Sequence, residues 1–233
     1  MFNFSDLVLE QLTLEVRYDN GYLYLDNCGK TFRKILDKWP AAKVDGVSVN
    51  EAKLQIQDKQ LTMVFSPDRV ALTQNYPAGI SELGEFSDFA VNTVREFLEI
   101  SAFTRVGNRF VYILKVEDEQ ESLDLMNKTG FFNVPSEKVS HIGNTVKNAN
   151  VRFQVTRGGE VGYGISLGHV GRTLNIQLPK PIKYDAGKFI LSGLAIDVDF
   201  YTMKPIESGN VKAHELIKKN SKNSWKKLLS RLA

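Results

Sequence analysis

The sequence predicts an α+β protein, built mostly from antiparallel sheets with helices packed against them. Strand-like stretches of alternating apolar and polar residues come in consecutive groups, and each group is followed by a stretch with helical spacing. The chain lacks the regular strand–helix–strand alternation that builds a parallel sheet. We therefore predict two lobes of similar element order, an N-terminal lobe (1–133) and a C-terminal lobe (149–233), joined by a polar connector (134–148).

The predicted strands are bounded by turn residues. Asp19-Asn20-Gly21 is the strongest hairpin signal and predicts that the strand before it pairs with the one after it. Asp58-Lys59 and Ser66-Pro67-Asp68 predict two further turns, since proline favours the start of a turn. In chain order the predicted strands are 12–18, 22–26, three within 53–76, 103–116, a hairpin over 150–168 around Gly158-Gly159, 172–178 and 188–202.

The predicted helices have apolar residues three and four positions apart. One over 29–39 ends before Pro40, because the residue before a proline disfavours the helical region. The clearest, over 85–102, has a single apolar stripe, and the helix over 119–130 ends in Gly130 at a typical C-cap. Two short helices, 208–220 and 222–232, close the chain.

Composition indicates a globular chain. Of its 233 residues 42% are hydrophobic and 24% are charged. No stretch approaches the roughly 18 apolar residues of a membrane span. Asp6 and Glu10 stand where a secretory signal would be basic and then apolar, so we expect a cytoplasmic protein. The single cysteine, Cys28, cannot form an internal disulfide or anchor a cysteine-rich metal site.

Basic residues are concentrated at the C-terminus. Residues 212–233 have a net charge of +6, so the rest of the chain carries −3. In the last helix Trp225, Leu228, Leu229 and Leu232 form an apolar stripe, which we expect to dock the terminal helical element on the second sheet. The basic side chains of the two C-terminal helices are predicted to contact an acidic partner or a nucleic acid; these are Lys218, Lys219, Lys222, Lys226, Lys227 and Arg231.

Two glycine-containing motifs resemble nucleotide-binding loops. Cys28-Gly29-Lys30-Thr31 lacks the earlier glycine of a phosphate-binding loop, and an ordinary helix start is the simpler interpretation. The glycines of 158–171 are one residue off the dinucleotide spacing and lack its strand–turn–helix context. Gly162 and Gly164 instead predict a strand face where a large side chain or another backbone packs closely.

Two carboxylates and two arginines are candidates for a binding site. Asp197 and Asp199 share one face of a predicted strand, as in sites where paired carboxylates hold a divalent cation. Arg105 and Arg109 flank Gly107 and could bind a carboxylate or a phosphate. A structural pairing between these arginines and aspartates is the interpretation we favour.

The usual nucleophiles lack a catalytic context. His141, His169 and His214 are far apart in the sequence. Ser166 lies within a predicted strand, although its neighbours match the outline of a nucleophile elbow. Cys28 has no assignable electropositive partner, so a buried thiol is expected. The sequence therefore predicts no catalytic residue and no cofactor.

Several stretches together resemble a provisional bacterial family that is sporadically distributed and has no established activity. That family is marked by an Arg-Ile-Gly-Leu-Arg-Tyr-like strand and a Leu-His-containing terminal helix. The similar stretches are FSPDRVALTQNYP, FSDFAVNTVREFLEI, FTRVGNRFVYIL, LAIDVDFYT and VKAHELIKKNSKNSWKKLLS, with the match carried by Arg105, Gly107, Arg109, Asp197 and His214. Asn108 and Phe110 replace the expected Leu and Tyr. The resemblance implies an α+β protein of two related lobes, and its sporadic distribution is typical of mobile or defence-linked loci.

Three functions follow as hypotheses. The first is a non-catalytic binding protein with a protein partner, as part of a bacterial defence or toxin-control system. The second is a nucleic-acid-binding protein that uses the basic C-terminus with Arg105 and Arg109. The third is a metal-dependent hydrolase that uses Asp197 and Asp199. We favour the first, and the oligomeric state stays open.

Overall fold

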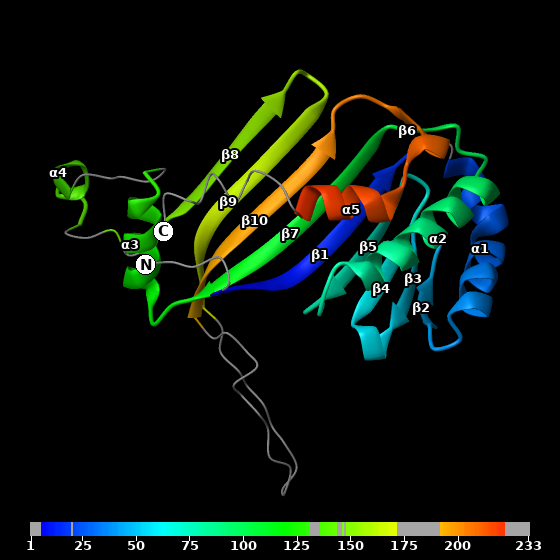
Figure 1. Cartoon of the computed structure of the whole chain (residues 1–233), viewed down its shortest axis with the longest axis horizontal. Helices are drawn as coiled ribbons and strands as arrows, with labels where there is room; N and C mark the ends of the chain where they lie inside the picture. Colours follow the sequence, from blue (N-terminus) through cyan, green and yellow to red (C-terminus); the bar gives the residue numbers. More distant parts are fainter. Residues whose placement is uncertain are drawn as a thin grey trace, which may run out of the picture.

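A computed structural model describes residues 6–19, 21–130, 136–143, 146, 148–171 and 192–221, to which all structural statements below refer. Nine strands form one antiparallel sheet in the order β2-β3-β4-β5-β1-β7-β10-β9-β8 (Figure 1). The α+β class with mainly antiparallel pairing is confirmed. The strands of this sheet are β1 (Leu7–Arg17), β2 (Lys43–Val47), β3 (Ala52–Ile56), β4 (Leu61–Phe65), β5 (Arg69–Asn75), β7 (Arg105–Lys115), β8 (Asn150–Arg157), β9 (Val161–Gly171) and β10 (Ser192–Thr202).

Four of the five described helices overlap predicted ones, although the first begins at Tyr24 and not at residue 29, and the short helix at Ser136–Val139 was not predicted. The helices are α1 (Tyr24–Lys38), α2 (Ser81–Phe97), α3 (Glu119–Lys128), α4 (Ser136–Val139) and α5 (Ala213–Ser221). A two-stranded ribbon is formed by β6 (Ala102–Phe103) and β11 (Ile206–Glu207). The predicted strand over 172–178 and the final helix over 222–232, with its apolar stripe, lie outside the described residues. No helix of the described part is long and apolar enough to cross a membrane.

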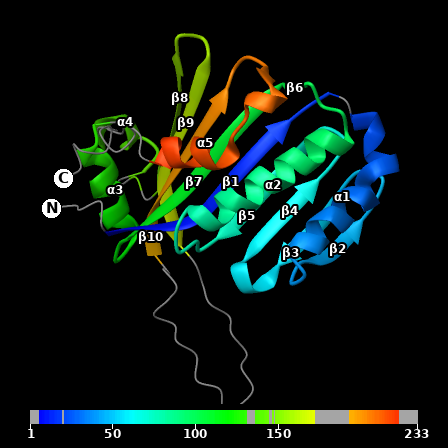
Figure 2. The same ribbon diagram turned by 45° about the vertical axis from the view of Figure 1, so that its right-hand side comes forward.

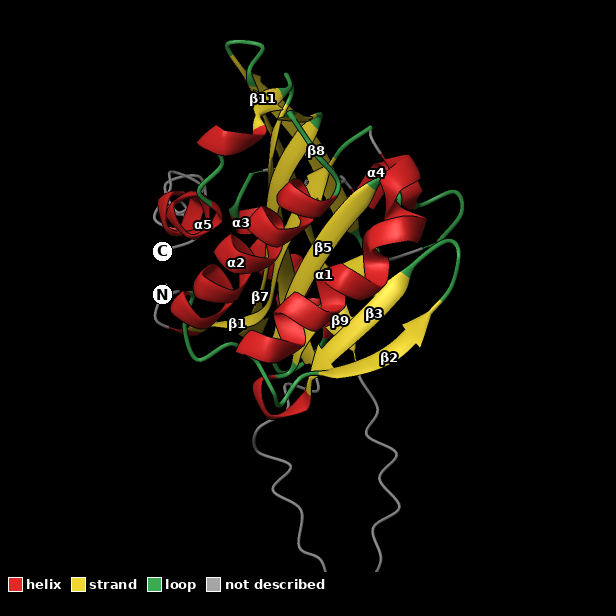
Figure 3. Cartoon of the chain, turned by 90° about the vertical axis from the view of Figure 1, so that its right-hand side faces the viewer, coloured by secondary structure: helices red, strands yellow, loops and turns green. Residues whose placement is uncertain are grey.

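Helices α1, α2 and α5 lie on the same face of the sheet (Figures 1 and 2). Strand β1 alternates strictly over residues 12–16: Leu12, Leu14 and Val16 are buried in the core, while Thr13 and Glu15 point to the other face and are half-buried. The same alternation is present on β5, with Val70 buried. Such alternation is typical of a sheet with one face packed and one face solvated. Figure 3 shows α1 and α2 side by side over the strands that they cover.

The two predicted lobes contribute to one continuous sheet. Strand β7 of the first segment pairs with β10 of the second, from Lys115↔Gly193 to Gly107↔Tyr201. No boundary in strand pairing separates 1–133 from 149–233, because the long apolar β7 has a partner on each side, β1 and β10. The turn signals at Gly158 and Gly159 are confirmed, since both have the positive φ that favours glycine.

The hairpin predicted at Asp19-Asn20-Gly21 is wrong. Residues 21–23 form a short 3-10 turn, and α1 begins at Tyr24, so the strand predicted at 22–26 does not form. Tyr24 opens a helical face, continued by Cys28 and Ile35, that is buried against the sheet. Five alternating residues are too few to separate this helical spacing from a strand. β1 pairs instead with β5 and β7, far along the chain.

Helix α5 packs against α2 and β7, whereas we expected the C-terminal helices on a separate second sheet. Ala213 and Ile217 are the buried residues of α5. Its first turn is held by Asp88 of α2, whose Oδ1 accepts the His214 backbone N–H at 3.2 Å. The His214 ring lies directly against Gly84 of α2, and a Cβ added there would lie 2.6 Å from the His214 Cγ. Glycine at this position therefore permits the close approach of the two helices.

We expect alanine to have opposite effects at two helical glycines. Gly84→Ala should lower the free energy of unfolding by about 1 kcal/mol, because overpacking against His214 (about 2 kcal/mol) exceeds the gain in helix propensity (about 1 kcal/mol). Gly29 lies within α1 with no other atom within 4 Å of an added Cβ. Gly29→Ala should therefore raise the free energy of unfolding by about 1 kcal/mol. Urea denaturation of both variants checks this, and stabilisation by both would contradict the close α2–α5 contact.

Candidate functional site

The face of the sheet opposite α1, α2 and α5 carries three arginines side by side. Arg17 on β1 is the direct cross-strand partner of Arg69 on β5 and, on its other side, of Arg105 on β7. We call Arg17, Arg69 and Arg105 the arginine row. Their side chains are 45%, 41% and 30% exposed, so all three guanidinium groups reach solvent. Like charges directly opposite one another in a sheet are destabilising, so this arrangement needs compensation.

A single carboxylate, Glu15, pairs with all three arginines and offsets part of their charge. It precedes Arg17 by two residues and lies on the same face of β1, and its Oε1 accepts from Arg17 Nε at 2.7 Å. Arg105 Nη1 lies 3.3 Å and Arg69 Nη1 3.7 Å from the same carboxylate. The hydrogen bond and the charge of Glu15 raise the pKa of Arg17. Glu15 is therefore the hub of the arginine row.

Arg105 and Arg109 are paired with the two aspartates that the sequence singles out. Arg105 Nη2 donates to Asp199 Oδ2 at 2.9 Å. Arg109 donates to both oxygens of Asp197, from Nε at 2.8 Å and from Nη2 at 2.7 Å. This two-pronged hydrogen bond raises the pKa of Arg109. The structural pairing that we favoured from the sequence is confirmed.

Glycines form the floor between these charged groups. Gly107 lies between Arg105 and Arg109, and a Cβ added there would be 3.7 Å from Asp199 Oδ1. Gly162 on β9 lies under the Tyr201 ring, where an added Cβ would overlap with the ring carbons. The predicted close approach at Gly162 is confirmed. The Tyr201 ring also contacts Arg105, whose guanidinium carbon lies 4.6 Å from the ring centroid.

Two hollows flank the paired side chains. One, of about 220 Å³, is lined by Glu15, Arg17, Arg105 and Asp199. The other, of about 330 Å³, lies toward the sheet edge. It is lined by Arg109, Arg152, Gln154, Ser166, Asp197 and Asp199, among others. Arg152, exposed on β8, has no ion-pair partner within the described residues, so it adds a positive charge available to a partner.

Burial raises the pKa of Asp199, with the Asp197 charge acting in the same direction and Arg105 only partly opposing it. The folded chain thus binds this proton more readily than the unfolded chain. The contribution of Asp199 to the free energy of unfolding should therefore be most favourable at acid pH and fall as the pH rises through the ordinary value of 3.8 and beyond.

Comparing wild type with Asp199→Asn isolates this contribution. Urea denaturation at pH 4 and at pH 7 measures the free energy of unfolding of both proteins. The wild-type value minus the variant value should be larger at pH 4 than at pH 7. A difference of the opposite sign would mean that Arg105 outweighs burial at this carboxylate.

Among the described residues, the remaining sequence candidates are not grouped as a metal site. No cluster of three or more His, Cys, Asp or Glu side chains that could hold a metal is present in the described ranges. Cys28 is buried, as expected, and burial raises the pKa of its thiol. It lies inside α1, so the helix start predicted at Cys28-Gly29-Lys30-Thr31 is wrong. His169 accepts or donates a hydrogen bond with Ser122 Oγ (2.9 Å), but Ser122 is fully buried on α3.

Ser166 and the basic C-terminal residues have separate positions. Ser166 lies on β9 opposite Asp197, in the wall of the larger hollow and not on a nucleophile elbow. Lys218 and Lys219 are exposed on α5, on the helix-bearing side of the sheet. They thus lie on the opposite side of the sheet from the arginine row. Lys222, Lys226, Lys227 and Arg231 lie outside the described residues.

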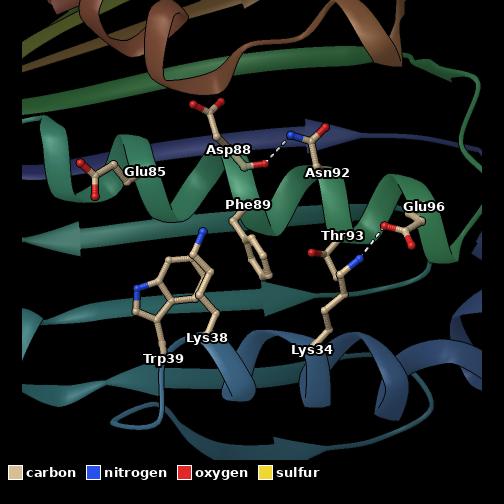
Figure 4. A pocket seen from close by; sticks show the side chains of 9 residues that line it. All are labelled: Lys34, Lys38, Trp39, Glu85, Asp88, Phe89, Asn92, Thr93 and Glu96. Carbon is tan, nitrogen blue, oxygen red and sulfur yellow. Dashed lines mark hydrogen bonds and ion pairs between the residues drawn. The ribbon is translucent and has the colours of Figure 1, made fainter.

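A groove of about 570 Å³ lies between α1 and α2 (Figure 4). Trp39 and Phe89 meet edge to face on one side of it, with ring centroids 4.9 Å apart. The Lys38 ammonium lies 4.3 Å from the Phe89 centroid and 4.9 Å from that of Trp39. Farther along, Lys34 Nζ pairs with Glu96 at 2.6 Å. The groove thus combines an aromatic end with a charged end.

The site residues predicted from the sequence did not include Arg17, Arg69 or Glu15, and the groove was not predicted either. The local signal for Arg17 and Glu15 was present, since both lie on the polar side of the alternating strand 12–18. Their meeting with Arg69 and Arg105 depends on β1 lying between β5 and β7, which the sequence pattern does not specify. No protein-family model matches the chain, and no curated protein matches it either.

Proposed function

We propose that this chain is a non-catalytic binding protein that recognises an acidic protein partner through its arginine face. The arginine face comprises the arginine row together with Arg109 and Arg152. The observation that supports this most is the alignment of three arginines in one cross-strand row around a single glutamate. Such a row costs stability in the free protein and would be compensated by carboxylates of a partner.

The mixture of charges favours a protein over a nucleic acid. Five arginines on this face are interleaved with three carboxylates, Glu15, Asp197 and Asp199. A surface that follows phosphates carries mainly one sign of charge, because each carboxylate would repel the backbone. Protein interfaces commonly match mixed patterns of charge and are enriched in arginine.

The same pairing argues against hydrolysis as the role of Asp197 and Asp199. A metal ion would have to compete with Arg109, which holds both oxygens of Asp197. Separating that pair removes a charge-assisted hydrogen bond on each oxygen. Calorimetry with Mg²⁺ and Mn²⁺ tests this alternative, and binding to wild type but not to Asp197→Ala would support the hydrolase over our proposal.

Binding of defined probes tests the proposal. Fluorescence anisotropy with an oligoglutamate peptide should show binding at low salt that weakens by about tenfold in Arg69→Glu. Arg33→Glu is the matched control, because Arg33 also reaches solvent but lies on α1, on the other face of the sheet. Equal loss of affinity in both variants would show that the peptide responds only to the net charge of the protein, and this would contradict the proposal. The absence of any binding to wild type would contradict the proposal.

Nucleic-acid binding is a second candidate, supported by the excess of arginines on this face and by the net charge of +6 over 212–233. For this function duplex DNA or single-stranded RNA should bind, with a logarithmic salt slope of about −0.9 per phosphate contact on duplex DNA. Binding should weaken both in Arg105→Ala with Arg109→Ala and on deletion of 222–233. If neither nucleic acid binds at low salt, this candidate is excluded.

A bacterial setting in defence or toxin control is part of the proposal and rests on the sequence resemblance alone. Plaque counts on host cells with and without the intact gene locus would test it. Protection that is lost with Arg69→Glu and kept with Arg33→Glu would connect the arginine face to that role.

A further inference from the structure

The groove between α1 and α2 lies on the helix-bearing side of the sheet, away from the arginine face, and already holds an ammonium group (Figure 4). The Lys38 ammonium lies within 5 Å of two ring centroids, those of Phe89 and Trp39. Lys38 forms no salt bridge within the described residues, so these rings are its only described partners. An aromatic surface that attracts a cation in this way is typical of sites for basic side chains.

The charges around the rings also favour a cation. Three carboxylates line the groove, those of Glu85, Asp88 and Glu96. Lys34 pairs with Glu96, and Asp88 accepts a backbone N–H of α5. Glu85 has no described hydrogen-bond or ion-pair partner. If Lys38 turned away, the groove lining would carry one lysine against three carboxylates.

Lys38 is able to give up this place. It is exposed, in the last turn of α1, and its long side chain has no other anchor among the described residues. Leaving the two rings costs one exposed cation–π contact, about 0.5–1 kcal/mol. A basic group from outside would recover that contact, and the carboxylates that line the groove would attract its charge.

We propose that the α1–α2 groove is a docking site for a basic segment of a protein partner, whose lysine or arginine side chain replaces Lys38 over Phe89 and Trp39. The volume of about 570 Å³ exceeds what a single ammonium group fills, so neighbouring residues of the segment also fit. The Lys34–Glu96 pair lies where such a neighbour would make polar contacts. This site is separate from the arginine face and does not depend on the function proposed for it.

Titration of the full chain with a tetralysine peptide tests the proposal by NMR. The chain has two tryptophans, so the indole N–H of Trp39 is the reporter and that of Trp225 the internal reference. The resonances are assigned with Trp225→Phe. We expect the peptide to shift the Trp39 resonance, and the fully acetylated peptide, which lacks the ammonium charges, to leave it unchanged.

Two variants make the result decisive. Lys38→Met keeps an unbranched side chain of similar length but removes the competing ammonium, so the peptide should bind about two- to fivefold more tightly. Phe89→Leu removes one ring and should weaken binding by a similar factor. Equal responses to the acetylated peptide, no tightening in Lys38→Met, or unchanged affinity in Phe89→Leu would each overturn the proposal.

Discussion

Replacing Phe110 with alanine should lower the free energy of unfolding by about 4 kcal/mol. Phe110 is fully buried on β7, at the centre of the sheet, opposite Leu12 of β1 and Val198 of β10. Its ring meets that of Phe200 edge to face, with centroids 6.0 Å apart. The substitution removes that contact and leaves a cavity at the point where the two halves of the chain join. Urea denaturation followed by far-UV circular dichroism measures the loss.

The position of Phe110 also makes the variant a test of domain organisation. Because β7 pairs with β1 and with β10, both halves of the sheet should unfold in one transition, in wild type and in the variant. Tyr22→Ala is the control: its side chain is 75% exposed, so its effect should stay within about 0.5 kcal/mol. Separate transitions by tryptophan fluorescence and by circular dichroism would contradict a single cooperative sheet and favour two lobes.

Local physics made most elements predictable. The three strands within 53–76 form as predicted, since each alternates apolar and polar residues between clear turn residues. The helix over 119–130 ends where Gly130, with φ of 72°, follows it. Each of these depends on residues within a few positions of each other. β2 was missed, because all five of its residues are exposed and no apolar alternation marks it.

Pairing between distant strands was not predictable from local patterns. The Asp19-Asn20-Gly21 signal favoured a local hairpin, but β1 is the strand that β5 and β7 flank. Burial of apolar side chains explains this pairing. The apolar face of β1 is buried at the centre of the sheet, whereas the residues after Gly21 bury their apolar side chains on one face of a helix. With a wrong partner for β1 the candidate site cannot be predicted either, because Arg17, Arg69 and Arg105 are neighbours only when β1 lies between β5 and β7.

The sequence therefore revealed which residues share one strand face, but not every partner that these residues meet across the sheet. Asp197 and Asp199 were identifiable because alternation alone places them on one face of β10. Their pairing with Arg109 and Arg105 was proposed from opposite charge and is present. Glu15 was not predicted as a site residue, because nothing in its own segment indicates that its carboxylate pairs with arginines on three strands.

Glu15→Gln should lower the free energy of unfolding by about 2 kcal/mol, because it leaves three neighbouring guanidinium groups without their shared carboxylate. Salt screens such repulsion, so the loss measured by urea denaturation should shrink between 0.05 and about 1 M NaCl. An unchanged loss at high salt would show that packing of the Glu15 side chain, and not its charge, is responsible.

Arg17→Gln should have the opposite effect on stability to Glu15→Gln. It tests whether the arginine row, which lowers stability, is needed for binding. Removing the central arginine relieves repulsion from both neighbours, so the free energy of unfolding should stay the same or rise by about 0.5 kcal/mol. In the double variant, Arg17→Gln should offset part of the stability lost through Glu15→Gln. Binding of the oligoglutamate probe should nevertheless fall by about tenfold. Recognition surfaces often keep such destabilising groups because a partner needs them. A variant that loses stability but keeps affinity would make the row a structural element and leave the arginine face without its proposed role.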